Sequence, residues 1–232
     1  MASALFYQPE ISHGVLSPDE SRHALTVLRL KEGDEIEITD GKGCLYTARL
    51  GACKKNQASF EIISSSTKSR RQMSIHLAVA PTKNIDRMEW LVEKCVETGV
   101  ESIHFMKCAR SERKDINIER LQKVAVSALK QSSQVWMPAL HPMVPFEEIL
   151  CIPVQDRFIA MVDESNPVSL QLSLRKNVDT LVLVGPEGDF SEEEAAAAQG
   201  KGFRKVSLGP NRLRTETAGL VAVVTMNLAS SQ

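Results

Sequence analysis

The chain has 232 residues, of which 43% are hydrophobic and 25% are charged, and its formal net charge at pH 7 is −1. These fractions are typical of a globular protein and argue against long disordered tracts and fibrous repeats. At about 100–150 residues per domain, the length suggests one large domain or two unequal ones. A near-neutral charge excludes nucleic-acid binding through bulk electrostatics but allows a local basic face.

Targeting segments, membrane spans and metal sites are not expected. The longest apolar stretch, residues 218–229, contains Thr225 and Asn227 and is shorter than the roughly 20 residues that span a bilayer. Residues 1–12 have no basic segment followed by an apolar run, so no secretory signal is expected. The five cysteines form no C-x-x-C pair and the five histidines show no metal-ligand spacing. We therefore expect a cytoplasmic protein with neither a membrane segment nor a metal.

The N-terminal third of the chain is rich in β-strand patterns. Residues 34–40 and 44–50 alternate apolar and polar side chains on either side of a glycine-containing turn, which predicts an antiparallel hairpin. Residues 59–65 predict a further strand, and residues 18–30 a short helix. The polar, basic segment 64–71 is interpreted as a linker.

From residue 74 onward, apolar runs alternate with helical patterns. Strands are expected at 75–80, 102–107, 158–163, 180–184 and 205–208. Helices are expected at 86–99, around 121–128, at 191–200 and at 215–228. Asp86 with Glu89, and Ser191 with Glu194, have the spacing of helix capping boxes. Alternating strands and helices indicate an α/β domain with a largely parallel sheet.

Two glycine-bearing turns follow the last two expected strands. Residues 183–191 read LVGPEGDFS, and residues 208–218 read LGPNRLRTETA. Ligands of parallel sheets bind beyond the carboxyl ends of the strands, where Gly185 and Gly188 allow close approach of the backbone. Neither turn has the glycine spacing of a dinucleotide or triphosphate site. Tight connections without a ligand remain the alternative interpretation.

Basic residues are unevenly distributed. Residues 201–214 hold five lysines and arginines and no acidic residue, and residues 107–130 are also rich in them. Together with Arg70 and Arg71, these runs could form a basic surface suited to a phosphate backbone. The alternative is that each run is a solvated face of the protein.

The two turn motifs resemble the RsmE family of 16S ribosomal RNA uridine-N3 methyltransferases, which belong to the SPOUT superfamily. Further segments similar to the family are 23–33 (HALTVLRLKEG), 83–99, and 110–113 (RSER) through 130–132 (KQS). The resemblance covers nearly the whole chain. Two positions depart from the family pattern: Asp189 replaces a common glycine, and Gln134 stands where many members have arginine.

The resemblance implies an α/β fold of two parts. Residues 1–70 would form a PUA-like RNA-binding β-barrel, and residues 74–232 a SPOUT methyltransferase domain with a trefoil knot near 180–228. It also implies a homodimer, S-adenosylmethionine as cofactor, and 16S rRNA in the small ribosomal subunit as substrate. By position, the cofactor-binding residues would be Leu183, Val184, Gly185, Pro186, Glu187, Gly188, Leu208, Gly209, Arg212, Leu213, Arg214 and Thr215. The RNA-binding residues would be Arg22, Arg29, Lys31, Arg70, Arg71, Arg110 and Arg113.

The implied reaction is methyl transfer to ring nitrogen N3 of a uridine. Arg214 and Arg110 are catalytic candidates, because a guanidinium holds phosphate or stabilises a developing uridine anion. Glu187 and Glu216 are the nearest candidates for the base, and the alternative for Glu216 is that it serves only to cap its helix. A knotted methyltransferase of other RNA specificity (ribose 2′-O or tRNA) and a non-catalytic RNA-binding module are the alternatives. A nicotinamide dehydrogenase is disfavoured, because the glycine turns lie late in the chain.

Overall fold

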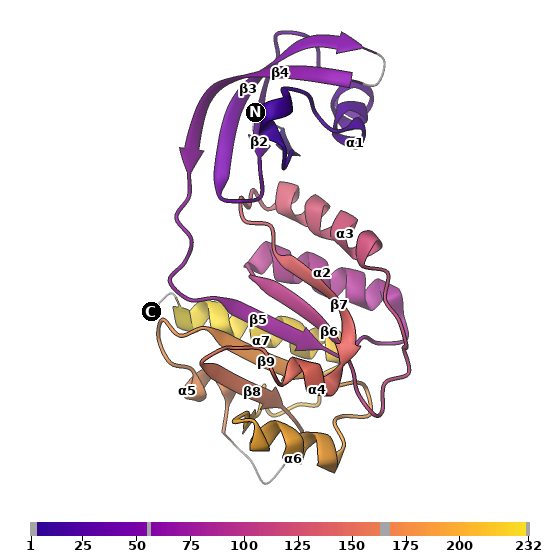
Figure 1. The fold of residues 1–232 in the computed structure, drawn as a ribbon, viewed down its shortest axis with the longest axis vertical. Coiled ribbons are helices and arrows are strands. Elements are labelled where there is room, and N and C mark those ends of the chain that lie inside the picture. Colours follow the sequence, from indigo (N-terminus) through magenta and orange to yellow (C-terminus); the bar gives the residue numbers. More distant parts are fainter. Residues whose placement is uncertain (1–3, 55–56, 163–167, 231–232) are drawn as a thin grey trace. The chain divides into compact units, whose positions relative to one another are not determined.

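The structure, a computed structural model, describes residues 4–54, 57–162 and 168–230 (Figure 1). Contacts within the chain divide it into an N-terminal unit, Met1–Arg70 with Leu129–Met137, and a C-terminal unit, Arg71–Ala128 with Pro138–Gln232. The expected α/β class is confirmed, because the C-terminal unit alternates strands with helices.

The N-terminal unit is built on a four-stranded sheet. Its strands, in spatial order, are β1 (Leu5–Tyr7), β2 (Glu35–Thr39), β3 (Cys44–Lys54) and β4 (Gln57–Thr67). The expected hairpin is confirmed: β2 and β3 are antiparallel, with Glu35 opposite Arg49. One face of this sheet packs around Phe6, Ile36 and Ile38, which are fully buried.

Two expectations for this unit were only partly right. The helix expected at 18–30 is divided into α1 (Pro18–Arg22), capped by Ser17, and a π-helical turn, His23–Val27. The first part of the expected linker 64–71 belongs to β4, which continues to Thr67. Its run of serines shows no alternation in the sequence, but its backbone pairs with the start of β3.

Residues 129–137 also belong to the N-terminal unit. No local sequence pattern predicted this association. The amide of Gly43 donates to the carbonyl of Val135 (2.9 Å), and the amide of Met137 donates to that of Gly41 (2.9 Å). The indole of Trp136 packs against Gly43, and the guanidinium of Arg70 lies 5.1 Å from the ring centroid. The turn of the β2–β3 hairpin is therefore covered by a segment from much later in the chain.

The C-terminal unit is built on a six-stranded sheet in which every pairing is parallel. Its strands, in spatial order, are β10 (Arg204–Val206), β8 (Asp156–Ala160), β9 (Thr180–Val184), β5 (Ile75–Val79), β6 (Ser102–Lys107) and β7 (Ala139–Pro145). The sequence missed β7, because Pro142 and Pro145 disfavour a strand; its position at the edge tolerates them. The expected strand 158–163 ends at Ala160, and Asp163 lies outside the described residues.

All expected helices are present. They are α2 (Ile85–Thr98), α3 (Ile118–Gln131), α6 (Glu192–Gly200) and α7 (Thr215–Ser230), with the short α4 (Phe146–Ile149) and α5 (Leu170–Ser173) in addition. The capping box of Ser191 and Glu194 is confirmed. The one expected from Asp86 was wrong, because the side chain of Asn84 caps α2 instead. None of the described helices combines the length and apolar character needed to cross a membrane.

Helices cover both faces of the parallel sheet. A Cβ atom on Gly219 of α7 would lie 3.0 Å from Leu91 of α2 and 3.3 Å from Leu77 of β5, so these three elements meet closely. On the other face, Phe146 of α4 and Ala198 of α6 belong to one buried cluster with strand residues. Both faces of the parallel sheet are therefore buried under helices, as is typical of such sheets.

Three histidines line up across β5, β6 and β7. His76 Nδ1 lies 2.6 Å from the hydroxyl of Ser102, which lies 2.8 Å from His104 Nε2. The ring of His104 stacks on that of His141, with centroids 4.1 Å apart. Burial, and then the charges of His141 and His76, lower the pKa of His104 to about 3. His104 is therefore neutral in the folded protein at neutral pH.

Replacing Gly43 with alanine should destabilise the N-terminal unit. Its φ is +101°, and a Cβ atom would lie 2.3 Å from a carbon of the Trp136 ring. Gly33→Ala is the matched control, because φ is +94° but nothing lies within 4 Å of its Cβ. We expect Gly43→Ala to cost about 2 kcal/mol more than Gly33→Ala in urea unfolding followed by Trp136 fluorescence in a Trp90→Phe background. Equal losses would contradict this account.

The histidine row should make stability depend on pH. The ordinary pKa of histidine is 6.5 and that of folded His104 is about 3, so between these values the unfolded chain binds the proton and the folded chain does not. Stability should therefore fall with decreasing pH across this window, by at most about 1.4 kcal/mol per unit. Urea unfolding should show a shallower slope for His104→Gln than for wild type. Equal slopes for wild type and His104→Gln would contradict this account.

Candidate functional site

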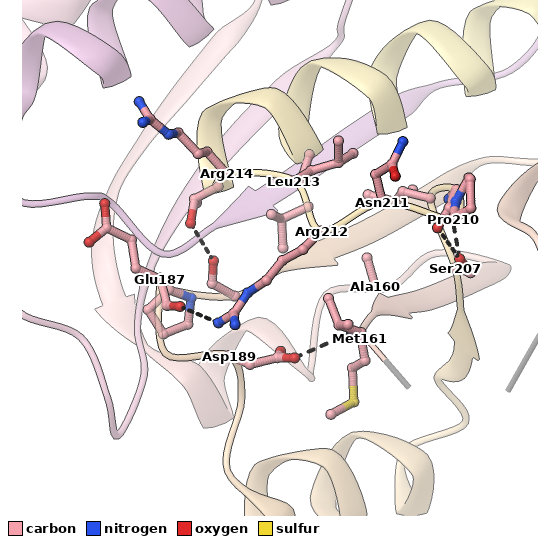
Figure 2. A pocket seen from close by; sticks show the side chains of 18 of the residues that line it. Ala160, Met161, Glu187, Asp189, Ser207, Pro210, Asn211, Arg212, Leu213 and Arg214 are labelled. Atoms are coloured by element: carbon pink, nitrogen blue, oxygen red, sulfur yellow. Dashed lines mark hydrogen bonds between the residues drawn. The ribbon is translucent and has the colours of Figure 1, made fainter. Parts of the chain in front are cut away.

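A cavity of about 620 Å³ lies at the carboxyl ends of β8, β9 and β10, within the C-terminal unit (Figure 2). The loop after β9 contributes Gly185, Glu187 and Asp189, and the loop after β10 contributes residues 207–214. The end of β8 adds residues 160–162. The volume falls within the range of small-molecule sites, and the location is the one expected for parallel sheets.

Side-chain hydrogen bonds join the three loops (Figure 2). The hydroxyl of Thr215, the first residue of α7, donates to the carbonyl oxygen of Gly185 (3.1 Å). Arg212 Nη2 reaches the carbonyl oxygen of Glu187 (3.4 Å). The carboxylate of Asp189 accepts a weak bond from the amide of Val162 (3.4 Å). The loop after β9 is thus tied to the other two.

The backbone conformation explains why glycine stands at position 209 and aspartate at position 189 of these loops. Gly209 has φ +133°, which side-chain-bearing residues rarely adopt, although nothing lies within 4 Å of its Cβ position. Asp189 has φ +61°, in the left-handed region that favours glycine but tolerates aspartate. Its carboxylate also accepts a bond from the amide of Phe190 (2.8 Å). The replacement of a common glycine by Asp189 therefore fits this backbone.

Most of the residues expected to bind the cofactor line the cavity. They are Val184, Gly185, Pro186, Glu187, Leu208, Gly209, Arg212, Leu213, Arg214 and Thr215. Leu183 and Gly188 are not among the lining residues. Leu183 is fully buried in the sheet, and the carbonyl oxygen of Gly188 accepts a bond from Arg110.

The sequence missed several lining residues. They are Arg87, Ala160, Met161, Val162, Asp189, Ser207, Pro210, Asn211 and Ala218. Those of the two turns lie inside the motifs already recognised. Residues 160–162 lie inside the expected strand 158–163, which extends beyond the observed end at Ala160, so the rule that sites form beyond strand ends did not find them. Arg87 comes from α2, and no spacing relates it to the turns.

The three catalytic candidates have different surroundings. Arg214 lines the cavity and is exposed, and its guanidinium has no hydrogen bond or ion pair with a described residue. The carboxylate of Glu187 accepts a hydrogen bond from Arg87 (2.9 Å). Arg110 does not line the cavity, and its Nη1 donates to the carbonyls of Gly188 (2.8 Å) and Phe190 (3.3 Å). Arg214 and Glu187 project away from Met161 in the view of Figure 2.

The basic residues expected to bind RNA in the C-terminal unit are bonded within the protein. Arg113 donates to the carbonyls of Thr82 (2.9 Å) and Lys83. Arg71 pairs with Glu101 (2.9 Å) and also bonds to Asn227. These guanidinium groups hold loops and α7 in place.

The basic residues expected to bind RNA in the N-terminal unit are more available. Arg29, at φ +56°, and Lys31 are exposed, and Arg22 pairs with Asp19 across 3.5 Å at an exposed site. Arg70 stacks on Trp136 and is also exposed. The described residues of the chain contain no group of three or more side chains arranged to hold a metal ion.

Comparison with known proteins decides the family. Residues 69–227 match the sequence model of an RNA methyltransferase domain, and residues 16–63 match that of an RNA methyltransferase PUA domain. The chain belongs to this family of RNA methyltransferases. The family inferred from the two turn motifs is thereby confirmed.

Similar proteins cover almost the whole chain. A crystal structure of a probable rRNA-methyltransferase from Porphyromonas gingivalis is 37% identical, with a TM-score of 0.92 and 98% of each chain covered. Ribosomal RNA small subunit methyltransferase E from Neisseria gonorrhoeae is 31% identical, with a TM-score of 0.88 over 99% of this chain and 98% of that one. The protein of the same name from Rickettsia conorii is 28% identical over 93% of this chain and 90% of its own length.

Removing the hydroxyl of Thr215 should loosen the cavity loops. In Thr215→Val, the buried carbonyl oxygen of Gly185 loses its partner, which should cost about 1–3 kcal/mol of unfolding free energy. Thr217→Val is the matched control, because the hydroxyl of Thr217 makes no hydrogen bond with a described residue. Urea unfolding of both variants measures the difference, and similar losses would show that the Thr215 bond contributes nothing specific.

Proposed function

We propose that this protein transfers a methyl group from S-adenosylmethionine to N3 of a uridine in 16S rRNA. The observation that supports it most is that the two glycine-bearing turns, recognised separately in the sequence, line one cavity and are joined by the bond from Thr215 to Gly185. The relatives named ribosomal RNA small subunit methyltransferase E support the choice of substrate.

The cavity suits S-adenosylmethionine. Its volume of about 620 Å³ accommodates a nucleoside-sized ligand, and its wall is largely formed by turns around Gly185 and Gly209. Such turns present backbone amides and carbonyls, which can recognise the edge of a flat heterocycle. The similar structures from Neisseria gonorrhoeae and Legionella pneumophila are both described as holding this cofactor. When bound, S-adenosylmethionine supplies an electrophilic methyl group, so the protein mainly orients the reactants.

The side chains at the cavity provide the remaining chemistry. The N3 atom of uridine carries a proton that must leave for the ring nitrogen to accept a methyl group. We assign its removal to the carboxylate of Glu187, whose side chain is 48% exposed and can return the proton to water. Arg214, whose guanidinium has no partner among the described residues, would stabilise the negative charge that develops on the uracil ring. Arg110 would act mainly by holding the carbonyl of Gly188.

RNA binding is assigned to the N-terminal unit. Arg22, Arg29 and Lys31 are exposed there, and guanidinium and ammonium groups bind phosphate. Arg70 presents a stacked guanidinium on the same unit. Arg71 and Arg113 would contribute to RNA binding only indirectly, because their guanidinium groups bond to other residues of the protein. The target base would have to leave its stack to reach the cavity.

Further parts of the proposal follow from the family. Residues 1–70 would act as the RNA-binding barrel and residues 74–232 as the catalytic domain, with a trefoil knot near 180–228. The enzyme would work in the cytoplasm on the small ribosomal subunit, as a homodimer. In support of a dimer, α2 exposes Trp90 (40%) and α7 exposes Leu228 (64%). Sedimentation of the purified protein would test this state.

The proposed activity can be tested by methyl transfer to small ribosomal subunits that lack the modification. With radiolabelled S-adenosylmethionine, we expect label in 16S rRNA and its recovery as N3-methyluridine on nucleoside analysis. Glu187→Gln should retain cofactor binding by calorimetry and lose about 100-fold or more in transfer rate.

Other outcomes distinguish the alternatives. Label in a ribose 2′-O-methyl nucleoside, or in tRNA only, would indicate a methyltransferase of other specificity. RNA binding without any cofactor binding would indicate a non-catalytic module. Either result would overturn the proposal.

A further inference from the structure

Arg87 is a charged residue that lines the cavity but lies outside both turn motifs. It belongs to the first turn of α2, which begins after the cap residue Asn84, and it lines the cavity. Its side chain is 32% exposed, so one part faces the cavity and the rest is packed.

The guanidinium of Arg87 contacts two carboxylates. Arg87 Nη1 donates to Glu187 Oε1 at 2.9 Å, and Arg87 Nε lies 3.7 Å from Glu216 Oε1. Glu187 comes from the loop after β9, and Glu216 from the first turn of α7. Arg87 therefore links α2 electrostatically to the loop after β9 and to the first turn of α7.

The two carboxylates differ sharply in burial. The side chain of Glu216 is only 10% exposed, and its Oε2 atom is buried without a hydrogen-bond partner among the described residues. An ionised carboxylate in such a place is costly unless a cation stays beside it. Glu216 therefore holds the guanidinium of Arg87 in position, while Glu187, whose side chain is 48% exposed, is the partner open to solvent.

The carboxylate of Glu187 depends on Arg87 for its orientation. The backbone of Glu187 is held independently, because its carbonyl accepts a bond from Arg212 (3.4 Å). Its carboxylate has hydrogen-bond or ion-pair contact with Arg87 and with no other described residue. Arg87 occupies Oε1 and leaves Oε2 open.

We propose that Arg87 is a positioning residue for proton removal: held by the buried Glu216, it aims the free oxygen of Glu187 at the N3 proton of the bound uridine. This inference rests on the proposed function. In the step, the N3–H bond breaks, the proton passes to Glu187 Oε2, and the electron pair stays on N3 for bonding to the methyl carbon. Arg87 does not itself gain or lose a proton.

The pH dependence of the rate separates this role from a purely structural one. At alkaline pH, the N3 proton of uridine begins to dissociate into water, so a base and the residue that orients it become dispensable. A defect caused by loosened loops or weakened cofactor binding would not shrink under these conditions. The comparison therefore needs transfer rates at neutral and at alkaline pH, relative to wild type at each.

The test uses the full-length chain with the variants Arg87→Met, Glu187→Gln and their combination. At neutral pH, with saturating cofactor and RNA, we expect Arg87→Met to lose about 10- to 100-fold in rate. The double variant should be no slower than Glu187→Gln, because both changes disable one step. The rate losses of Arg87→Met and of Glu187→Gln, each relative to wild type, should be at least severalfold smaller at alkaline pH. Binding of S-adenosylhomocysteine, measured by calorimetry, should change less than about threefold.

Two further variants keep the test decisive. Arg120→Met is the matched control: Arg120 pairs with Asp86 and Glu89 on α2 but does not line the cavity, so its rate and pH profile should match wild type. Arg87→Lys keeps a cation beside Glu216 without the two-armed geometry. If Arg87→Met fails to fold, as judged by thermal unfolding, Arg87→Lys carries the comparison and should show a smaller, pH-sensitive defect.

Several results would overturn the inference. These are an unchanged rate at neutral pH, a defect equally large at both pH values, a double variant whose loss is the product of the single losses, or loss of cofactor binding. Failure of the proposed function itself has a different signature. In that case wild type would not produce N3-methyluridine at all, whatever the behaviour of the Arg87 variants.

Discussion

The shortest of the three hydrogen bonds that join the cavity loops links residues 30 positions apart, from the hydroxyl of Thr215 to the carbonyl oxygen of Gly185 (3.1 Å). Gly185 follows β9, whose five residues are all buried and which lies between β8 and β5. The end of β9 is therefore a fixed point, because strands on both sides hold it. Thr215 begins α7, which packs on α2 and β5. The bond thus closes the loop after β10 against a rigid edge, and the space enclosed becomes a binding site.

The elements that could be predicted from sequence are those set by local chemistry. Residues 102–107 and 180–184 were recognised as strands with the observed bounds, because short apolar runs between turn residues specify them. Ser191 and Glu194 marked the start of α6, since a capping box satisfies amides only three residues apart. The two turn motifs also located most of the cavity wall, because strand ends in a parallel sheet share one edge.

The elements that could not be predicted depend on partners distant in sequence. Arg87 and Glu187 are 100 residues apart, and neither side chain differs in type from the many solvated charges of the chain. Residues 129–137, the end of α3 and the segment after it, pack on the β2–β3 hairpin, a contact set by the fit of Trp136 against Gly43. The prolines of β7 are likewise explained only by the position of this strand at the edge of the sheet. In each case the deciding interaction exists only after the chain has folded.

The arginines show why counting charge does not locate function. In the sequence, Arg71, Arg113 and Arg214 belong to one class of basic residues that could bind phosphate. In the structure, the first two use their donors on the protein's own oxygens, and moving them toward a ligand would break those bonds. Arg214 has no such bond to break among the described residues, so its guanidinium is available to an anion at the cavity. Availability, rather than charge, therefore distinguishes a functional arginine from a structural one, and it is a property of the folded chain.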